Sequence, residues 1–226
     1  MTTTATSAPA AAPAALAVFD AAIRRADAGR PVTLTIMDDR GTEHRIDAAA
    51  WCRGHLPGDR GLLARCAGPT LDVGCGPGRL TRALHRLGHP ALGIDVSAAA
   101  VRLARARGAT VLRRDVFGPL PGHGRWRHLL LADGNIGIGG EPGALLRRCR
   151  ELLSHDGRLH VELAPPGTRS WSGYARIRHE VRAASAPFRW AQLAADDLAE
   201  VAGASALQIS ATWTEANRWF ATLTRA

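Results

Sequence analysis

The sequence contains no lysine, so arginine supplies all 29 basic residues against 20 acidic ones, and the formal net charge is +9. A strongly basic surface attracts nucleic acid. The arginines are, however, spread along the chain without aromatic residues between them, and they accompany an abundance of alanine. A nucleic-acid site would concentrate them on one face. We therefore interpret the charge as biased amino-acid usage, and a nucleic-acid partner is not favoured.

Cysteine is also scarce. Cys52, Cys66, Cys75 and Cys149 are far apart and form no C-x-x-C pair. This spacing excludes a zinc cluster and a redox dithiol, and it predicts reduced, mostly buried thiols. His160 and Glu162 alternate onto one strand face without a third ligand, so no metal is predicted.

Long apolar runs are absent as well. No run approaches the about 18 residues that a membrane span needs, and the N-terminus lacks the features of a signal peptide. We expect a cytoplasmic protein with no membrane partner. The composition, with 46% hydrophobic and 22% charged residues, is that of a folded globular protein. The length of 226 residues predicts one domain with a sizeable extension.

The first part of the chain predicts a tail and a small extension. Residues 1–13 are rich in Ala, Thr and Pro and are predicted to be disordered. Apolar spacing predicts a helix over 16–28, and two β-branched runs, 32–37 and 43–46, predict a hairpin. A short helix within 57–67 is also expected. We therefore assign residues 14–67 to a helix and hairpin cap.

From residue 68 onward, short apolar strands alternate with helical periodicities. The expected strands are 70–73, 91–94, 110–112, 128–132 and 158–163, and the helix before the last of these is expected to end at Asp156-Gly157. Segments 206–214 and 218–224 predict a terminal hairpin. Residues 68–226 are thus predicted to form an α/β domain, a doubly wound and mostly parallel seven-stranded sheet with a C-terminal antiparallel hairpin.

The first strand of this domain runs into a glycine-rich loop, Leu71-Asp72-Val73-Gly74-Cys75-Gly76-Pro77-Gly78. Ligands of such sheets bind beyond the carboxyl ends of the strands, where glycines allow close approach and the next helix offers unpaired N–H groups. Asp95, 21 positions after Gly74, ends the second strand and is placed to accept both hydroxyls of a ribose. A dinucleotide fingerprint would need glycine where Arg79 stands, so a different nucleoside ligand is indicated.

With its G-x-G-x-G spacing, the sequence resembles the class I S-adenosylmethionine-dependent methyltransferase family from about Thr70 to the terminal hairpin. Beside the loop, the resemblance rests on Gly93-Ile94-Asp95-Val96-Ser97, Arg114-Asp115-Val116-Phe117 and Leu130-Leu131-Ala132-Asp133-Gly134-Asn135. In that family the first of these segments binds the ribose and the second binds the adenine. The third lies where the methionine moiety meets the methyl acceptor.

The resemblance implies S-adenosylmethionine as cofactor. The cofactor-binding residues that it implies are Asp72, Gly74, Cys75, Gly76, Gly78, Asp95, Val96, Asp115, Val116 and Asp133. Asp72 typically faces the methionine amino group in such proteins. The alternative for each acid is that it caps the helix that follows it.

The acceptor side is less defined by the sequence. Asp133, Asn135 and His179 are the candidate catalytic residues. The segment 164–190 is too long for a plain crossover and is predicted to be a lid over the acceptor. His179 could act as a base, or could be solvated or hydrogen-bonded, and Arg176 or Arg178 could hold an acceptor carboxylate.

We therefore expect an enzyme that transfers the methyl group of S-adenosylmethionine to a small-molecule acceptor, whose O, N, S or C nucleophile stays open. The loop 133–142 lacks the Asn/Asp-Pro-Pro-aromatic motif of the enzymes of this fold that methylate nucleic-acid amino groups. The alternatives are transfer of the aminocarboxypropyl arm of the same cofactor, or an RNA- or protein-binding module that retains the cofactor fold. The sequence does not indicate an oligomeric state.

Overall fold

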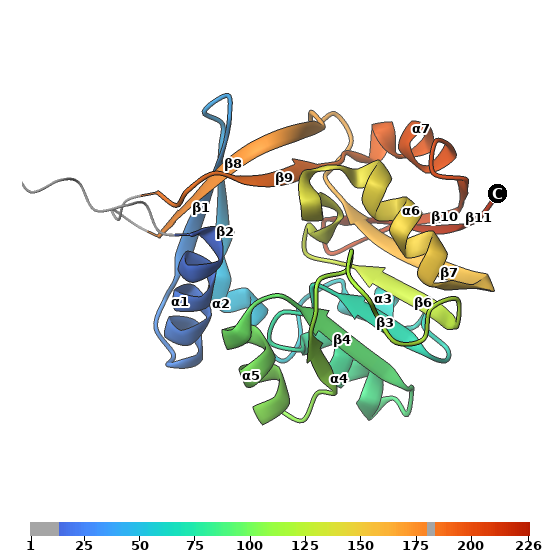
Figure 1. Ribbon diagram of the computed structural model, residues 1–226, viewed down its shortest axis with the longest axis horizontal. Helices are drawn as coiled ribbons and strands as arrows, with labels where there is room; N and C mark the ends of the chain where they lie inside the picture. Colours follow the sequence, from blue (N-terminus) through green and yellow to red (C-terminus); the bar gives the residue numbers. More distant parts are fainter. Residues whose placement is uncertain (1–13, 180–183) are drawn as a thin grey trace, which may run out of the picture.

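The computed structural model describes residues 14–179 and 184–226, and it contains the predicted seven-stranded sheet (Figure 1). The predicted tail, 1–13, lies outside the described residues. The strand order is β10-β11-β7-β6-β3-β4-β5. The strands are β3 (Thr70–Val73), β4 (Ala91–Asp95), β5 (Val111–Arg113), β6 (Trp126–Leu131), β7 (Leu153–Leu163), β10 (Leu207–Glu215) and β11 (Arg218–Arg225).

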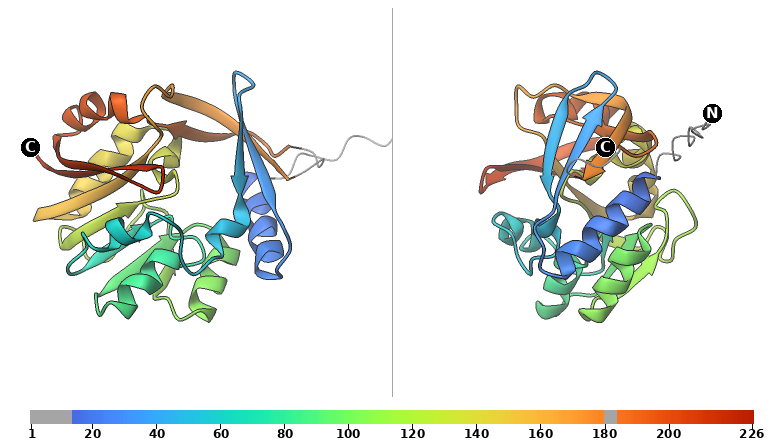
Figure 2. Two further views of the ribbon diagram at one scale, coloured as in Figure 1. Left: turned by 180° about the vertical axis from the view of Figure 1, so that it is seen from behind. Right: turned by 90° about the vertical axis from the view of Figure 1, so that its left-hand side faces the viewer.

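Helices cover both faces of this sheet, because each helix has one apolar face to bury. One face carries α3 (Asp59–Leu63), α4 (Arg79–Arg86) and α5 (Ala98–Ala106), and the other carries α6 (Pro142–Leu152) and α7 (Leu198–Gly203) (Figures 1 and 2). Leu145 and Leu146 of α6 pack with Leu129 and Leu131 of β6 in the largest apolar cluster. Short 3-10 turns, η1 (Asn135–Gly140) and η2 (Ala195–Asp197), precede α6 and α7.

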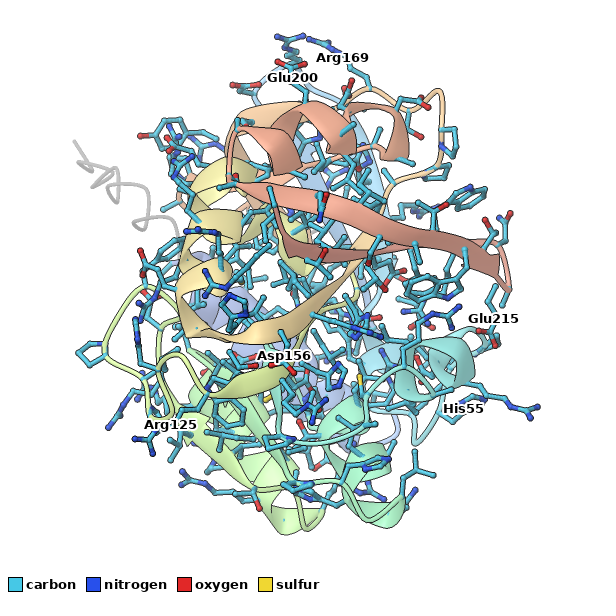
Figure 3. The ribbon with its side chains drawn as sticks, turned by 90° about the vertical axis from the view of Figure 1, so that its right-hand side faces the viewer. His55, Arg125, Asp156, Arg169, Glu200 and Glu215 are labelled. Carbon is cyan, nitrogen blue, oxygen red and sulfur yellow. The ribbon has the colours of Figure 1, made fainter. Side chains whose placement is uncertain are left out.

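The terminal hairpin is present as predicted, and β11 is the antiparallel strand of the sheet. Its two-residue turn, Ala216-Asn217, has positive φ at both positions, which suits the right-handed twist of the flanking strands. At the tip of the hairpin, the Glu215 carboxylate accepts the N–H of Gly61 in α3 (2.8 Å). Figure 3 shows Glu215 on the same side of the molecule as His55, which precedes α3.

The cap is a second sheet that combines two distant parts of the chain. Its strands, in the order β2-β1-β8-β9, are β2 (Glu43–Asp47), β1 (Thr33–Asp38), β8 (Trp171–His179) and β9 (Phe188–Gln192). The helices α1 (Ala15–Asp27) and α2 (Ala48–Trp51) complete it. Ile36 of β1 pairs in register with Ile177 of β8. The N-terminal hairpin and the strands β8 and β9 of the segment predicted as a lid are therefore one sheet, at one end of the central sheet (Figure 2).

One predicted boundary was wrong. The helix expected to end at Asp156-Gly157 ends at Leu152, and Leu153 already begins β7. Leu153 pairs with Trp126, and the register shifts before Arg158 pairs with His128. The buried Leu153 fits an inward position of either a helix or a strand, so apolar spacing alone did not separate the two.

Among residues 14–179 and 184–226, no helix has both the length and the apolar character that crossing a membrane requires.

Candidate active site

A cavity of about 360 Å³ lies at the carboxyl ends of β3, β4 and β6 and extends beneath the cap sheet. Its volume is in the range of small-molecule sites. The predicted cofactor residues that line it are Asp72, Gly74, Cys75, Gly76, Asp95, Val96, Asp115, Val116 and Asp133. Gly78 is outside the lining and lets α5 approach, because a Cβ there would meet the Cβ atoms of Ala104 and Ala109 at 3.0 and 2.9 Å.

Asn135 holds the glycine-rich loop in place. Its Nδ2 donates to the carbonyl oxygens of Val73 and Gly74, both at 2.9 Å. A Cβ on Gly74 would lie only 2.7 Å from that Nδ2. The predicted catalytic residue Asn135 does line the cavity, and its amide positions the loop that the cofactor would contact.

Asp95 has the geometry expected of a ribose acceptor. Its Oδ1 accepts the N–H of Ser97 (2.7 Å) and its Oδ2 accepts the N–H of Gly76 (2.9 Å). Each carboxylate oxygen has a further lone pair for a hydroxyl donor. Burial raises the pKa of Asp95 although these N–H donors lower it. The Ser97 hydroxyl in turn donates to Asp20 of α1, which ties the cap to this part of the site.

The predicted adenine station forms a neighbouring wall. Val96 is 46% exposed, which leaves its side chain free to contact a ring. Val116 is buried beside it in the lining, and the Asp115 carboxylate accepts the N–H of Phe117 (3.0 Å). Two apolar surfaces and one acceptor are the groups that an aminopurine would use.

Asp72 is buried at the end of β3. Its Oδ2 accepts from the Thr81 hydroxyl (2.7 Å) and from the Thr81 N–H (3.2 Å) in the first turn of α4. The helix-capping alternative therefore holds for this acid, which also lines the cavity. Burial raises the pKa of Asp72 to about 6, and the Thr81 hydroxyl and the Arg79 charge counteract that rise.

A largely buried ionic network that the sequence did not predict lies at the part of the cavity that Arg79 and Asp133 line. Asp133 pairs with Arg79 from α4 and with Arg218 from β11 (3.1 Å). Both arginines also pair with Asp59 at the start of α3. Arg218 further binds Glu162 of β7 at 2.7 and 2.8 Å. Five charges, from α3, α4, β7, β11 and the loop after β6, thus meet at one end of the sheet.

This network engages the predicted residue Asp133 with two guanidinium groups. Asp133 also has positive φ (+54°), and its N–H donates to Glu162 (2.6 Å). Arg79 occupies the position where a dinucleotide fingerprint would have glycine. Its side chain is almost fully buried (5% exposed), and only the structure shows this burial. Asp59 and Arg218 carry no motif that could have singled them out.

Within 164–179 and 184–190, the described part of the predicted lid, no charged residue or histidine lines the cavity. His179 lies in β8 opposite Leu34 of β1 and is outside the lining. Arg176 donates to the carbonyl oxygen of Ser185, and Arg178 pairs with Glu43. The structure therefore does not bring His179 together with Asp133 and Asn135, and neither arginine is placed to hold an acceptor carboxylate.

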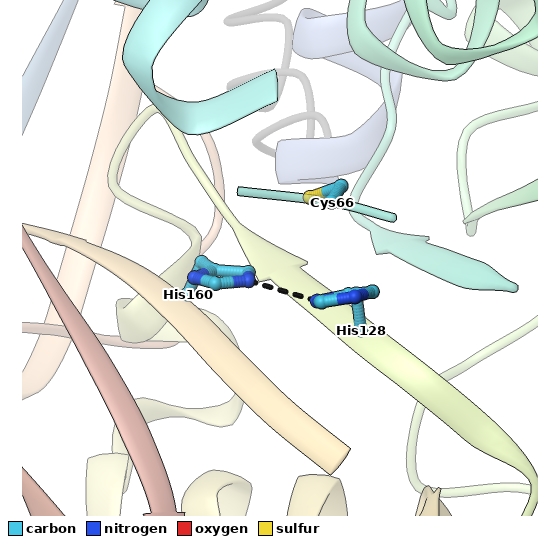
Figure 4. A group of neighbouring side chains, drawn as sticks. All are labelled: Cys66, His128 and His160. Atoms are coloured by element: carbon cyan, nitrogen blue, oxygen red, sulfur yellow. Dashed lines mark hydrogen bonds between the residues drawn. The ribbon is translucent and has the colours of Figure 1, made fainter. Parts of the chain in front are cut away.

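A separate cluster outside the cavity lining consists of Cys66, which follows α3, His128 of β6 and His160 of β7 (Figure 4). His128 Nε2 accepts the N–H of Ala67 (3.2 Å), so its Nδ1 carries the proton and donates to His160 Nε2 (3.0 Å). His160 Nδ1 then donates to the Thr222 hydroxyl (3.0 Å). These bonds use the ring nitrogens that a metal ion would need, so the geometry is that of a neutral hydrogen-bonded chain across β6, β7 and β11.

The hydrogen bonds that join His128, His160 and Thr222 make the stability of the folded protein sensitive to acid. Burial lowers the pKa of His160 from 6.5 to about 3. As pH falls below 6.5 the unfolded chain binds this proton first, so stability present at neutral pH is lost down to about pH 3. At pH 5 the expected loss from His160 is about 2 kcal/mol of unfolding free energy. Urea unfolding between pH 7 and 5 should give a steeper decline for the wild type than for His160→Asn. The exposed His123→Asn control should decline like the wild type, and equal slopes for all three proteins would contradict the prediction.

Known proteins share both the domain and the fold. A family model described as a methyltransferase domain matches residues 70–157. A search of curated proteins finds no match. A solved structure of an S-adenosylmethionine-dependent methyltransferase from Bacteroides fragilis, in complex with S-adenosylhomocysteine, is similar with a TM-score of 0.77 and 23% identity. The match covers 95% of this chain and 97% of that one.

Two further solved structures are similar at lower scores. The 1,6-didemethyltoxoflavin-N1-methyltransferase from Burkholderia thailandensis has a TM-score of 0.51 and 18% identity over 94% of this chain and 79% of its own. The CcbJ methyltransferase from Streptomyces caelestis has a TM-score of 0.57 and 16% identity over 74% of this chain and 88% of its own. At these identities the likeness establishes the fold. Residues 70–157 thus match a methyltransferase domain model, and the chain has the fold of the class I S-adenosylmethionine-dependent methyltransferases.

Proposed function

We propose that this protein binds S-adenosylmethionine in the cavity of about 360 Å³ and transfers its methyl group to a small-molecule acceptor. The observation that carries the proposal is the composition of that cavity. One end has the glycine-rich loop, a ribose acceptor and an adenine wall, and the other end is covered by the cap sheet. Solved structures of this fold that contain S-adenosylmethionine or S-adenosylhomocysteine support the choice of cofactor.

The residues fit the cofactor by their donor and acceptor chemistry. Asp95 would hold the ribose hydroxyls, and Val96, Asp115 and Val116 would hold the adenine. The backbone of the loop from Gly74 to Gly76, which Asn135 positions, would face the methionine end. The arginine–acid network brings both charge signs to that end, where an amino group and a carboxylate must be bound.

S-adenosylmethionine, held by the glycine-rich loop and Asp95, would supply an electrophilic methyl group to the acceptor. The protein's contribution is alignment and exclusion of water. The cap sheet and α1 supply this by covering the cavity with apolar side chains. Every residue that the cap adds to the described lining is apolar, so the contribution of the cap is to position the acceptor.

The test is calorimetric titration of the purified protein with S-adenosylmethionine and with S-adenosylhomocysteine, followed by mass analysis of products formed from a mixture of small-molecule acceptors. Binding of both ligands and products heavier by one methyl group are expected. Products that carry the aminocarboxypropyl arm would indicate the alternative reaction. The absence of both heat and a thermal shift with either ligand would refute the proposal, and salt-dependent RNA binding would then favour a binding module.

A further inference from the structure

The part of the cavity under the cap has a uniform chemistry. Every residue that α1, β1, β2, α2, β8 and β9 contribute to the described lining is apolar. These residues are Ala15, Leu16, Phe19, Ile36, Ile46, Trp51, Ile177, Phe188 and Trp190. Ile138 of η1 adds another apolar side chain. The charged residues of the lining belong to the central-sheet side, where the predicted cofactor stations lie.

Four of the cap residues are aromatic and form two pairs. Phe19 of α1 and Trp51 of α2 have ring centroids 4.9 Å apart. Phe188 and Trp190, both of β9, have ring centroids 6.1 Å apart with their planes at 61°. Aromatic faces of this kind favour offset or edge contacts with another ring. The walls under the cap therefore suit a flat, unsaturated molecule better than a flexible polar chain.

The cap also lacks a group in this lining that could balance a charge on the acceptor. The nearby arginines of β8 and β9 are occupied elsewhere, since Arg176 donates to Ser185, Arg178 pairs with Glu43 and Arg189 pairs with Glu141 (2.9 Å). An ionised group that is buried without a partner is strongly disfavoured. A carboxylate or ammonium on the acceptor would meet such a cost in this chamber.

We propose, as a refinement that rests on the proposed function, that the methyl acceptor is an uncharged, planar aromatic molecule that packs between the Phe19–Trp51 and Phe188–Trp190 pairs. The total cavity also has to hold the cofactor. The space under the cap therefore selects a compact ring system. Selection against charged analogues comes from the apolar lining alone, without a discriminating polar residue.

The experiment measures binding of two matched probes, 2-naphthol and naphthalene-2-carboxylate, by calorimetry at pH 7. The full-length protein is first titrated with S-adenosylhomocysteine and then kept saturated with it. At pH 7 the phenolic probe is uncharged and the carboxylate is ionised. We expect 2-naphthol to bind at least about 10-fold more tightly than the carboxylate, because only the carboxylate loses hydration without gaining a partner.

Variants then locate the probe. Trp190→Ala and Phe188→Ala are expected to weaken 2-naphthol by about 5-fold or more, through loss of ring contact, while S-adenosylhomocysteine binds as before. Tyr174→Ala is the matched control, because Tyr174 is in the same sheet, is 53% exposed and is outside the lining. Ile46→Lys, at a partly buried lining position, should reverse the preference toward the carboxylate.

The two proposals fail in different ways. Absence of S-adenosylhomocysteine binding would overturn the proposed function. If that ligand binds but the carboxylate equals or exceeds 2-naphthol, or neither probe binds, the acceptor proposal is overturned and the methyltransferase function stands. Equal effects of Tyr174→Ala and Trp190→Ala on 2-naphthol would also overturn it.

Discussion

Replacement of Asp95 with alanine is expected to weaken binding of S-adenosylmethionine and S-adenosylhomocysteine by about 100-fold or more. Hydrogen bonds to a charged group contribute roughly 1.5–3 kcal/mol each, and the carboxylate of Asp95 would accept two from the ribose. The same carboxylate holds the N–H of Gly76 in the glycine-rich loop. Its removal therefore takes away both the ribose acceptors and a support of the loop. Calorimetric titration of the variant beside the wild type measures the effect.

Two controls separate these contributions. Asp95→Asn keeps one acceptor oxygen and removes the charge, so an intermediate affinity is expected. Asp156→Ala removes an exposed acid near the start of β7 (labelled in Figure 3), whereas the cavity lies at the carboxyl ends of the strands, so the affinity should be unchanged. Thermal melting of each variant shows that it is folded. Unchanged affinity of a folded Asp95→Ala protein would contradict the assignment of the ribose site.

Replacement of Arg79 with methionine is expected to lower the free energy of unfolding by about 3–5 kcal/mol, the range for breaking a buried ion pair from one side. Arg79 is 5% exposed and pairs with Asp59, which is 1% exposed, and with Asp133. Methionine preserves much of the apolar stem but leaves these acids with only Arg218 as their cationic partner in the network. Urea unfolding at pH 7 measures the loss.

The comparison for this variant is Arg86→Met, which changes an exposed arginine in the same helix and should shift stability by less than about 0.5 kcal/mol. Adding Asp59→Asn to Arg79→Met should restore part of the loss, because the buried charge disappears while an acceptor for the N–H of Leu56 remains. A double variant less stable than Arg79→Met alone would show that the uncompensated charge of Asp59 is not the cause.

Much of the central domain was predictable because its signals are local. The apolar strand 70–73 coincides with β3, and the glycine spacing after it predicts a tight turn that only the backbone of glycine adopts easily. The position of Asp95 at the cavity was predictable because this residue ends the next strand, β4. The terminal hairpin follows from the two segments, 206–214 and 218–224, that flank residues 215–217, and Ala216-Asn217 forms its turn.

The local pattern was insufficient where one residue type suits two structures. Leu153 satisfies an inward helical position and an inward strand position equally, so the end of α6 was placed too late. His179 illustrates the same point for function. A histidine in a lid is a candidate base until the pairing of β8 with β1 places it away from the cavity.

By itself, the sequence determined the order of strands and helices, the class of fold and most residues on the sheet side of the cavity, because hydrophobic period, turn chemistry and strand-end acids are encoded within a few residues. Tertiary structure alone decided the rest. The strands β1, β2, β8 and β9 form one cap sheet, and one ionic network joins Asp59, Asp133, Glu162, Arg79 and Arg218. These contacts join segments up to 159 positions apart, and no local periodicity specifies which distant charges or strand edges will meet.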